Sequence, residues 1–272
     1  MVSERNLPPE FAREISTFTL RVCTPIYWHD RRQPFPKDVQ GASCFFLRFE
    51  ERVVGITADH VVDAYYAARA QTPALVCQVR LAPFDLDAAL IDRDRGLDLA
   101  TFAVSENEVR TIDAVPIDCR GNWPPPTPDR MRAASLAGFP EIMRIVRPDR
   151  SAEFKAYGAL PTVEDVTDSQ IIFTYDPERD AALHTPKPPL GFNLSGCSGG
   201  PVLMHGMRNG LHRWFPVGLI IRGPRDVGKG EIASFDIIRA RRIHCLKPDG
   251  TLEKPSAGGW LPELDPGIRT IG

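Results

Sequence analysis

The sequence of 272 residues lacks several features that would assign it to a class at once. It contains no run of about 18 apolar residues, so we expect no membrane-spanning helix and no membrane partner. The N-terminal stretch has no basic segment followed by an apolar one, so we expect no secretory signal and a cytoplasmic location. The formal net charge is −2, which excludes the strongly basic composition of proteins that bind nucleic acid, so no nucleic-acid partner is expected.

The cysteines also lack a recognisable arrangement. The six of them include no C-x-x-C pair and no spacing typical of metal ligands; they are Cys23, Cys44, Cys77, Cys119, Cys197 and Cys245. We therefore expect free thiols in a reducing cytosol, with no metal and no cofactor.

Proline, in contrast, is abundant. The 26 prolines are about twice the usual share, which favours turns and short strands over long helices. Short apolar runs typical of strands recur along the chain, for example ASCFFLRF (42–49) and LDLATFAV (97–104). The clearest linker is GNWPPPTPD (121–129), because a run so rich in proline cannot join the interior of a sheet. In SFDIIRARRIHCL (234–246) apolar residues recur at helical spacing, which predicts a terminal helix.

Many short strands on either side of a proline linker favour an all-β arrangement of two barrels over alternating β-α-β units. The sequence therefore predicts five segments. They are an N-terminal extension (1–40), a first β-barrel (41–120), a proline-rich linker (121–130), a second β-barrel with the terminal helix (131–246) and a C-terminal tail (247–272).

Residues 196 to 201 read GCSGGP, and a serine among glycines is typical of a sharp turn that presents its hydroxyl to a ligand. The stretch matches the G-x-S-x-G elbow of α/β-hydrolases. That elbow needs a helix directly after the serine, whereas Pro201 and the following VLMHGMRNG indicate a strand and a turn. It also needs a parallel sheet, which the sequence does not predict, so the elbow is the weaker interpretation.

GCSGGP also resembles the G-x-S-G-G-P signature of trypsin-like (chymotrypsin-fold) serine proteases. That family needs a histidine, an aspartate and a serine in this chain order. GITADHVVDA resembles the family's histidine motif, with His60 as the catalytic histidine, and GLDLATFAV resembles its aspartate motif, with Asp98 as the acid. The resemblance extends from about residue 41 to residue 246 and is specific because the motifs occur together and in order.

The resemblance implies two six-stranded antiparallel β-barrels with the site between them. Ser198 would be the nucleophile, His60 the base that takes its proton, and Asp98 the acid that orients the imidazole. The backbone N–H groups of Gly196 and Ser198 would form the oxyanion hole. Phe192 would lie at the base of the substrate pocket and Gly223 would line it, and without a carboxylate at Phe192 no preference for basic side chains is expected.

One position departs from the family. Cys197 stands where secreted members carry an aspartate that pairs with a newly cut N-terminal amine. Activation by N-terminal cleavage is therefore not expected, and the site is either preformed, as in some bacterial relatives, or ordered by a partner or substrate. Cys197 lies one position before the place where viral cysteine relatives carry their nucleophile, so a buried structural thiol is the better interpretation.

Three other aspartates compete with Asp98 for the orienting role. Asp59 directly precedes His60, but neighbours in sequence normally point in different directions. Asp92 and Asp94 lie in a charged run that indicates a solvated loop. Asp98 is the preferred candidate.

The function that these residues predict is that of a cytoplasmic serine endopeptidase, similar to bacterial intracellular members of the family. It would hydrolyse peptide bonds in a protein or peptide substrate through an acyl-enzyme, and a dedicated partner protein in a regulatory system is a second expectation. A rival hypothesis from another class is a catalytically weak fold that acts as a peptide-binding or scaffold module. A third is an α/β esterase. The sequence does not identify the physiological substrate.

Overall fold

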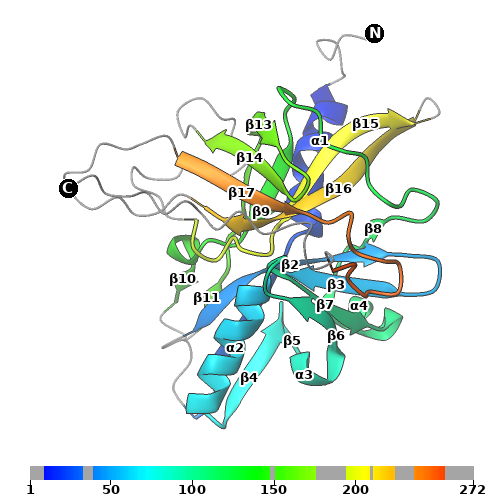
Figure 1. Ribbon diagram of the computed structural model, residues 1–272. Helices are drawn as coiled ribbons and strands as arrows, with labels where there is room; N and C mark the ends of the chain where they lie inside the picture. The colour runs from blue at the N-terminus through cyan, green and yellow to red at the C-terminus, as the bar shows by residue number, and fades with distance from the viewer. Residues whose placement is uncertain are drawn as a thin grey trace, which may run out of the picture.

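The fold is built mainly from β-strands in two large sheets (Figure 1). It is known from a computed structural model, which describes residues 9–32, 39–147, 151–175, 194–208, 211–223 and 236–254. With few helices beside two antiparallel sheets, the architecture agrees with the expected all-β, chymotrypsin-like two-barrel fold. None of the helices in the described ranges is long and apolar enough to span a bilayer.

The first sheet lies in the lower half of Figure 1 and has eight strands. Their order is β5-β4-β1-β2-β3-β7-β6, and β8 pairs in parallel with β2. The strands are β1 (Thr24–Asp30), β2 (Gln40–Arg48), β3 (Val53–Thr57), β4 (Leu75–Val79), β5 (Ala82–Pro83), β6 (Leu90–Asp94), β7 (Leu99–Val104) and β8 (Ile117–Asp118). β2 and β3 form the hairpin that the charged pair Glu50 and Glu51 between two apolar runs predicts.

The second sheet lies in the upper half of Figure 1 and has seven strands in the order β12-β9-β15-β16-β17-β14-β13. They are β9 (Ser135–Gly138), β12 (Tyr157–Ala159), β13 (Val163–Val166), β14 (Gln170–Tyr175), β15 (Pro201–Arg208), β16 (Leu211–Arg222) and β17 (Asp236–Arg242). A separate pair, β10 (Ile145–Val146) and β11 (Ala152–Glu153), follows the short 3-10 helix η2 (Glu141–Met143).

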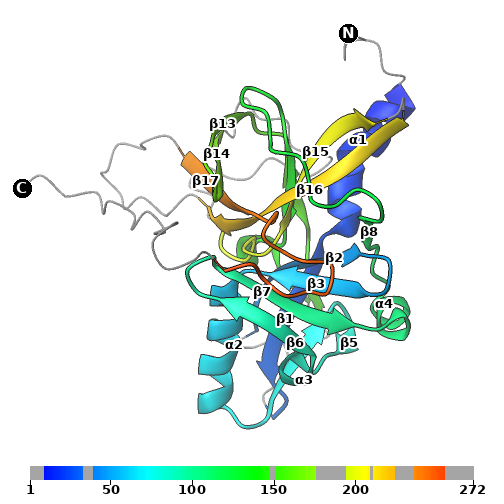
Figure 2. The same cartoon turned by 45° about the vertical axis from the view of Figure 1, so that its right-hand side comes forward.

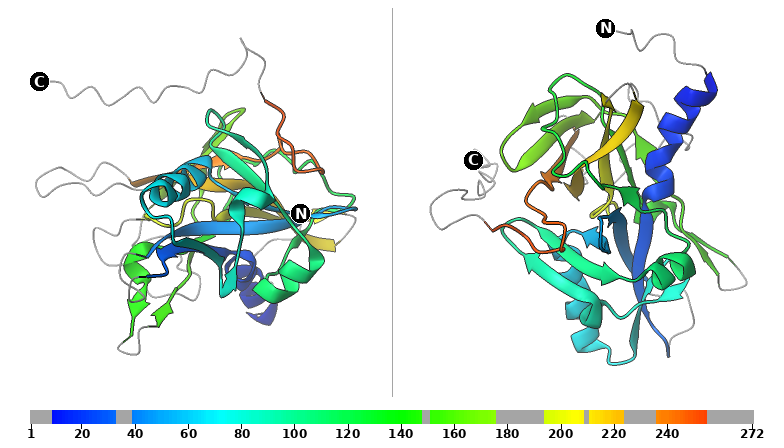
Figure 3. Two further views of the ribbon diagram at one scale, coloured as in Figure 1. Left: turned by 90° about the horizontal axis from the view of Figure 1, so that it is seen from below. Right: turned by 90° about the vertical axis from the view of Figure 1, so that its right-hand side faces the viewer.

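The α-helices cover the outside of the sheets (Figures 2 and 3). They are α1 (Pro9–Val22), α2 (Asp59–Gln71), α3 (Leu86–Ala89) and α4 (Glu106–Ile112). α2, α3 and α4 accompany the first sheet, whereas α1 packs against β9, β12 and β15 of the second. The N-terminal helix therefore belongs structurally to the part of the fold that carries Ser198.

Two hydrophobic cores meet at β15 and β16. Leu203 and Leu219 pack into the core of the first sheet, whereas Val202 and Ile220 pack into the core of the second. Because successive residues of a strand point to opposite faces, the same two strands can serve both cores. The serine loop directly precedes β15, so this packing places it at the boundary between the sheets.

The predicted terminal helix over 234–246 is wrong. Residues Asp236–Arg242 form β17, which pairs with β14 on one side and β16 on the other. Within it Ile238 and Ala240 are fully buried and Ile237 is exposed, which is the period-two pattern of a strand. The backbone hydrogen bonds offered by two neighbouring strands outweigh a helical spacing of four apolar residues.

The number and position of the strands also differ from the expected six strands in each barrel. The first sheet includes β1, which pairs with β2 and β4, so it begins within the segment 1–40 that was expected to be an extension. Beyond β17, Leu246 and Leu252 pack into the core of the first sheet, although the chain there was expected to belong to the second barrel and the tail. The chain thus returns to the first sheet after completing the second.

A buried pair of hydroxyls fastens α1 to the second sheet. Thr19 Oγ1 donates to Ser135 Oγ at 2.6 Å, and Thr19 is fully buried. We expect Thr19→Val, which keeps the shape and removes the donor, to lower the free energy of unfolding by about 1–3 kcal/mol. Urea denaturation measures this, with Thr111→Val on the exposed surface of α4 as the control. Equal midpoints for the two variants would contradict the assigned bond.

Candidate functional site

His60 is the second residue of α2, and the structure places it against Asp98. Its Nδ1 lies 2.9 Å from Asp98 Oδ2, and its backbone N–H donates to Asp98 Oδ1 at 3.0 Å. The first N–H groups of a helix have no partner within the helix, so the carboxylate acts here as a cap as well as a partner for the imidazole. The backbone and side chain of His60 are thus both oriented by one carboxylate.

Asp98 reaches His60 because the chain turns sharply between β6 and β7. Its backbone has φ +52°, and its N–H donates to Arg95 O at 3.3 Å. The turn begins where Leu97 N donates to the Asp94 carboxylate at 2.8 Å. Aspartate is one of the few residues that adopt this left-handed conformation readily, so the turn suits the residue that it presents.

The surroundings of His60 set its charge. Burial alone would lower the pKa of His60, but the hydrogen bond and charge of Asp98 and the charges of Asp59 and Asp63 outweigh burial, so its pKa is raised. Because the pKa is higher in the folded than in the unfolded state, the pair stabilises the fold most at low pH. That contribution is lost as the pH rises through the raised pKa.

The three competing aspartates have other partners. Asp59 is buried and receives Nε and Nη2 of Arg93 at 2.5 and 2.9 Å. Asp92 accepts hydrogen bonds from Leu252 N and Lys254 Nζ, and Asp94 accepts one from Leu97 N. Asp92 and Asp94 lie in β6, so the charged run expected to be a loop is a strand that ends in the turn before Asp98.

The serine loop is bound to the first sheet through Ser198 and Gly199. The carbonyl of Ser198 accepts a hydrogen bond from Ser43 N on β2 at 2.9 Å. Gly199 has φ +83° and lies against Ser43 O and Thr57 Oγ1, where any Cβ would overlap both atoms. Thr57 ends the strand that leads into α2, so this close approach brings Ser198 beside the segment that carries His60.

The backbone around Ser198 leaves two N–H donors available. The carbonyl of Ser195 accepts from Glu141 N at 2.8 Å, and the carbonyl of Cys197 accepts from Gly200 N at 2.9 Å. In a trans peptide the N–H points opposite to the carbonyl, so these bonds turn the N–H groups of Gly196 and Ser198 to the other side. Neither N–H has an acceptor among the described residues, so both can bind an oxygen of a ligand.

The structure does not join all three predicted catalytic side chains by hydrogen bonds. Within the described part of the chain, His60 and Asp98 are bonded, but no bond connects the Ser198 hydroxyl to His60. Such contacts are often long without substrate and tighten when it binds. The His60 side chain is about half exposed, at 47%.

The predicted substrate pocket is described only in part. Gly223 follows β16 and lies against Leu194, since a Cβ there would come 2.5 Å from Leu194 Cβ. Leu194 is buried, so it forms part of the wall next to Gly223. Phe192 lies outside the described residues.

Cys197 is buried at 1% exposure, in agreement with a structural thiol. Its Sγ and Cβ lie so close to Gly138 on β9 that a Cβ there would come 2.6 Å from Cys197 Cβ. Burial, reinforced by Cys23, raises the pKa of the Cys197 thiol well above its ordinary value. A protonated buried thiol is a poor nucleophile, so Ser198 is the candidate that the loop presents.

Arg241 is a residue near the site that the sequence analysis did not single out, because it lies in the segment 234–246 that was expected to be a helix. It is 4% exposed on β17, and its Nη2 donates to Gly96 O at 3.4 Å. Its Nε is without a hydrogen-bond partner in the described ranges. Burial lowers the pKa of Arg241, while the charge of Asp98 opposes this, so the buried Arg241 lies within electrostatic range of the Asp98 carboxylate.

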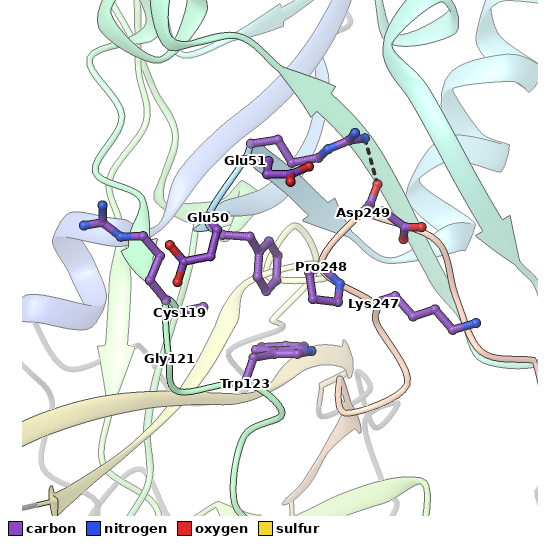
Figure 4. Close-up of a pocket in the computed structure, with 11 residues that line it drawn as sticks. Glu50, Glu51, Cys119, Gly121, Trp123, Lys247, Pro248 and Asp249 are labelled. Carbon is purple, nitrogen blue, oxygen red and sulfur yellow. Dashed lines mark hydrogen bonds between the residues drawn. The ribbon is translucent and has the colours of Figure 1, made fainter.

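A separate pocket of about 580 Å³ lies away from these residues (Figure 4). Phe49 and Trp123 form part of it and meet edge to face at 5.1 Å between ring centroids. Glu50, Lys247 and Asp249 line it, so its charges are of both signs. It contains none of the predicted catalytic residues.

Comparison with known proteins finds similarity only among solved structures. No protein-family model matches the chain, and neither does any curated protein. A serine endoprotease from Yersinia pestis is similar over 87% of this chain and 64% of its own, under two thirds of its length, at 11% identity and a TM-score of 0.45. A thermostable serine protease from an extremophilic microorganism is similar over 82% of this chain and 91% of its own, at 12% identity and a TM-score of 0.40. Neither likeness assigns a function to this chain.

Proposed function

We propose that this protein is a serine endopeptidase whose reacting groups are Ser198, His60 and Asp98. The observation that carries the proposal is the carboxylate–imidazole pair, 2.9 Å apart, at the start of a helix that adjoins the serine loop. An aspartate that holds one ring nitrogen of a histidine leaves the other nitrogen to accept a proton from a hydroxyl. The available N–H groups of Gly196 and Ser198 support the same proposal.

In the first half of the proposed reaction, Ser198 Oγ forms a bond to the carbonyl carbon of the scissile peptide. His60 Nε2 takes the hydroxyl proton, and the carbonyl oxygen, now negative, is bound by the N–H groups of Gly196 and Ser198. The C–N bond then breaks, and the proton on His60 moves to the departing amine. Asp98 remains ionised and stabilises the imidazolium while it exists.

In the second half, water attacks the acyl-enzyme. His60 takes a proton from the water, whose oxygen bonds to the acyl carbon, and the same two N–H groups bind the second oxyanion. The bond to Ser198 Oγ breaks, the proton returns to Ser198, and the carboxylic acid product leaves. Every proton passes through His60, so the reaction needs its imidazole neutral at the start.

A fluorophosphonate probe tests the nucleophile without knowledge of the substrate. Its phosphorus bonds to an activated serine oxygen and fluoride leaves, and peptide mass mapping then locates the adduct. We expect an adduct on Ser198 in the wild type and none in Ser198→Ala. Incubation with a mixture of unstructured peptides, followed by sequencing of the new termini, tests cleavage itself. An intact mixture and an unlabelled Ser198 would refute the proposal and favour the peptide-binding module.

The pH dependence of labelling follows from the charge on His60. Because the pKa of His60 is raised above its ordinary value of 6.5, His60 stays protonated to a higher pH. We expect the labelling rate to rise with pH through a midpoint above 6.5, since only neutral His60 accepts the serine proton. Rates measured from pH 5 to 9 check this. A midpoint at or below the ordinary value would show that the charges around His60 do not act as assigned.

A further inference from the structure

Besides the backbone contacts of Ser198 and Gly199, one side-chain hydroxyl of the first sheet, that of Ser43, binds the serine loop. Ser43 lies on β2 and is fully buried. Its hydroxyl donates to the carbonyl of Gly196 at 2.8 Å and accepts the N–H of Phe139 at 2.9 Å. A serine hydroxyl has one hydrogen to donate, and in this structure the Gly196 carbonyl accepts it. Ser43 therefore connects β2 with two segments of the second half of the chain.

The first of these bonds fixes the peptide between the two candidate oxyanion donors. The Gly196 carbonyl is held by Ser43, and the N–H of the same peptide, on Cys197, donates to Leu194 O at 2.9 Å. Gly196 has φ +93°, a conformation that glycine enters and leaves easily, so nothing in the residue itself prevents the peptide from turning. The Ser43 hydroxyl, together with the Leu194 carbonyl, supplies the restraint that the glycine lacks.

The second bond acts on the neighbouring peptide. Phe139, which donates to Ser43, lies two residues before Glu141, whose N–H holds the Ser195 carbonyl. This segment packs tightly on the loop, because a Cβ at Gly196 would come 2.5 Å from Phe139 O and 3.0 Å from Glu141 N. By binding Phe139, Ser43 also helps to position Glu141, whose N–H binds the Ser195 carbonyl and so orients the Gly196 N–H toward a ligand.

We propose that Ser43 is the positioning residue that keeps the oxyanion hole formed in the uncut chain. The inference rests on the proposed function and adds to it the regulation of the site: activity is constitutive and needs neither chain cleavage nor a partner. Cys197 is buried and uncharged, so no ion pair at that position holds the loop. A neutral hydroxyl between two backbone groups supplies the restraint instead.

The test compares two buried serines. Ser43→Ala removes the hydroxyl that holds the loop, whereas Ser135→Ala removes a buried hydroxyl on β9 whose partner is Thr19. We expect Ser43→Ala to lower the rate of fluorophosphonate labelling by about 10- to 100-fold, less than the loss of an entire oxyanion donor. Ser135→Ala should label at the wild-type rate even where its thermal midpoint falls as far as that of Ser43→Ala.

Two labelling results would overturn the inference and leave the proposed function standing. One is a Ser43→Ala protein that labels as fast as the wild type. The other is a wild type whose labelling rate rises more than about tenfold on addition of cell extract or after limited proteolysis. If the oxyanion hole is already formed, neither treatment should raise the labelling rate.

A crystal structure of Ser43→Ala decides the inference independently of activity. We expect the Gly196–Cys197 peptide to rotate, so that the Gly196 carbonyl no longer points toward position 43. An unchanged loop would overturn the positioning role. This result also separates the two proposals in a protein that does not label. A rotated peptide would support the positioning role of Ser43, while the absent adduct would refute the role of Ser198 as nucleophile.

Discussion

Asp98→Asn should lower the rate of fluorophosphonate labelling by about 10⁴-fold while leaving the fold intact. The amide oxygen can still accept the His60 N–H at the start of α2, so the cap is retained. The side-chain amide cannot hold the imidazole in the tautomer that accepts a proton from serine, nor stabilise its cation. Stopped labelling reactions at saturating probe measure the loss, and circular dichroism checks that the fold persists.

Asp92→Asn is the matched control for this prediction. Asp92 lies on the neighbouring strand and accepts hydrogen bonds from Leu252 and Lys254, so its neutralisation should leave labelling unchanged within about twofold. A loss below about tenfold in Asp98→Asn would show that another carboxylate orients His60. Asp59 would then be the residue to neutralise next, because its charge also raises the pKa of His60.

Arg93→Met should lower the free energy of unfolding by about 3–5 kcal/mol, because it leaves a buried carboxylate without its partner. Asp59 is 1% exposed and receives two hydrogen bonds from Arg93. Arg93 also bonds to Asp63 and lies over the ring of Tyr66, with 5.7 Å to its centroid. Since Asp59 directly precedes His60, this ion pair anchors the start of the helix that carries the imidazole. Guanidinium denaturation at pH 7 measures the effect.

Arg95→Met provides the comparison, because Arg95 bonds to the same Asp63 from an 85% exposed position. An exposed ion pair contributes about 0–1 kcal/mol, so the control should remain near the wild-type stability. The double variant Asp59→Leu with Arg93→Met should recover part of the loss, since it removes the buried charge along with its partner. Similar losses in Arg93→Met and Arg95→Met would contradict the burial of this pair.

Some features could be predicted from the sequence, because they depend on residues that are adjacent in the chain. The hairpin at Glu50 and Glu51 follows from a short pattern, because its turn depends on adjacent residues. The order of His60, Asp98 and Ser198 was likewise visible, since each lies in a short motif. Their roles as base, orienting acid and nucleophile remain proposals that the labelling experiments test.

Other features depended on neighbours far away in the chain. Residues 236–242 have a helical spacing but became a strand between β14 and β16, because each neighbour supplies a row of backbone partners. Arg241 is buried for the same reason, since a central strand has no wet face at that position. β1 joined the first sheet through pairing with β2 and β4, and its own seven residues do not specify these two partners.

The sequence by itself determined the all-β class, the glycine-rich loop at Ser198 and the chain order of the candidate catalytic residues, because turn chemistry and strand period are local properties. Only the tertiary structure decided what holds these residues in place. Ser43 and Gly196 are 153 positions apart and belong to different halves of the fold, so their contact forms only when the two sheets pack, whereas His60 and Asp98 are 38 positions apart and meet within the first half of the fold. The sequence around Ser43, an apolar strand, does not predict that its hydroxyl binds the serine loop. Hydrogen bonds between distant segments form only when the fold brings the strands that carry them together.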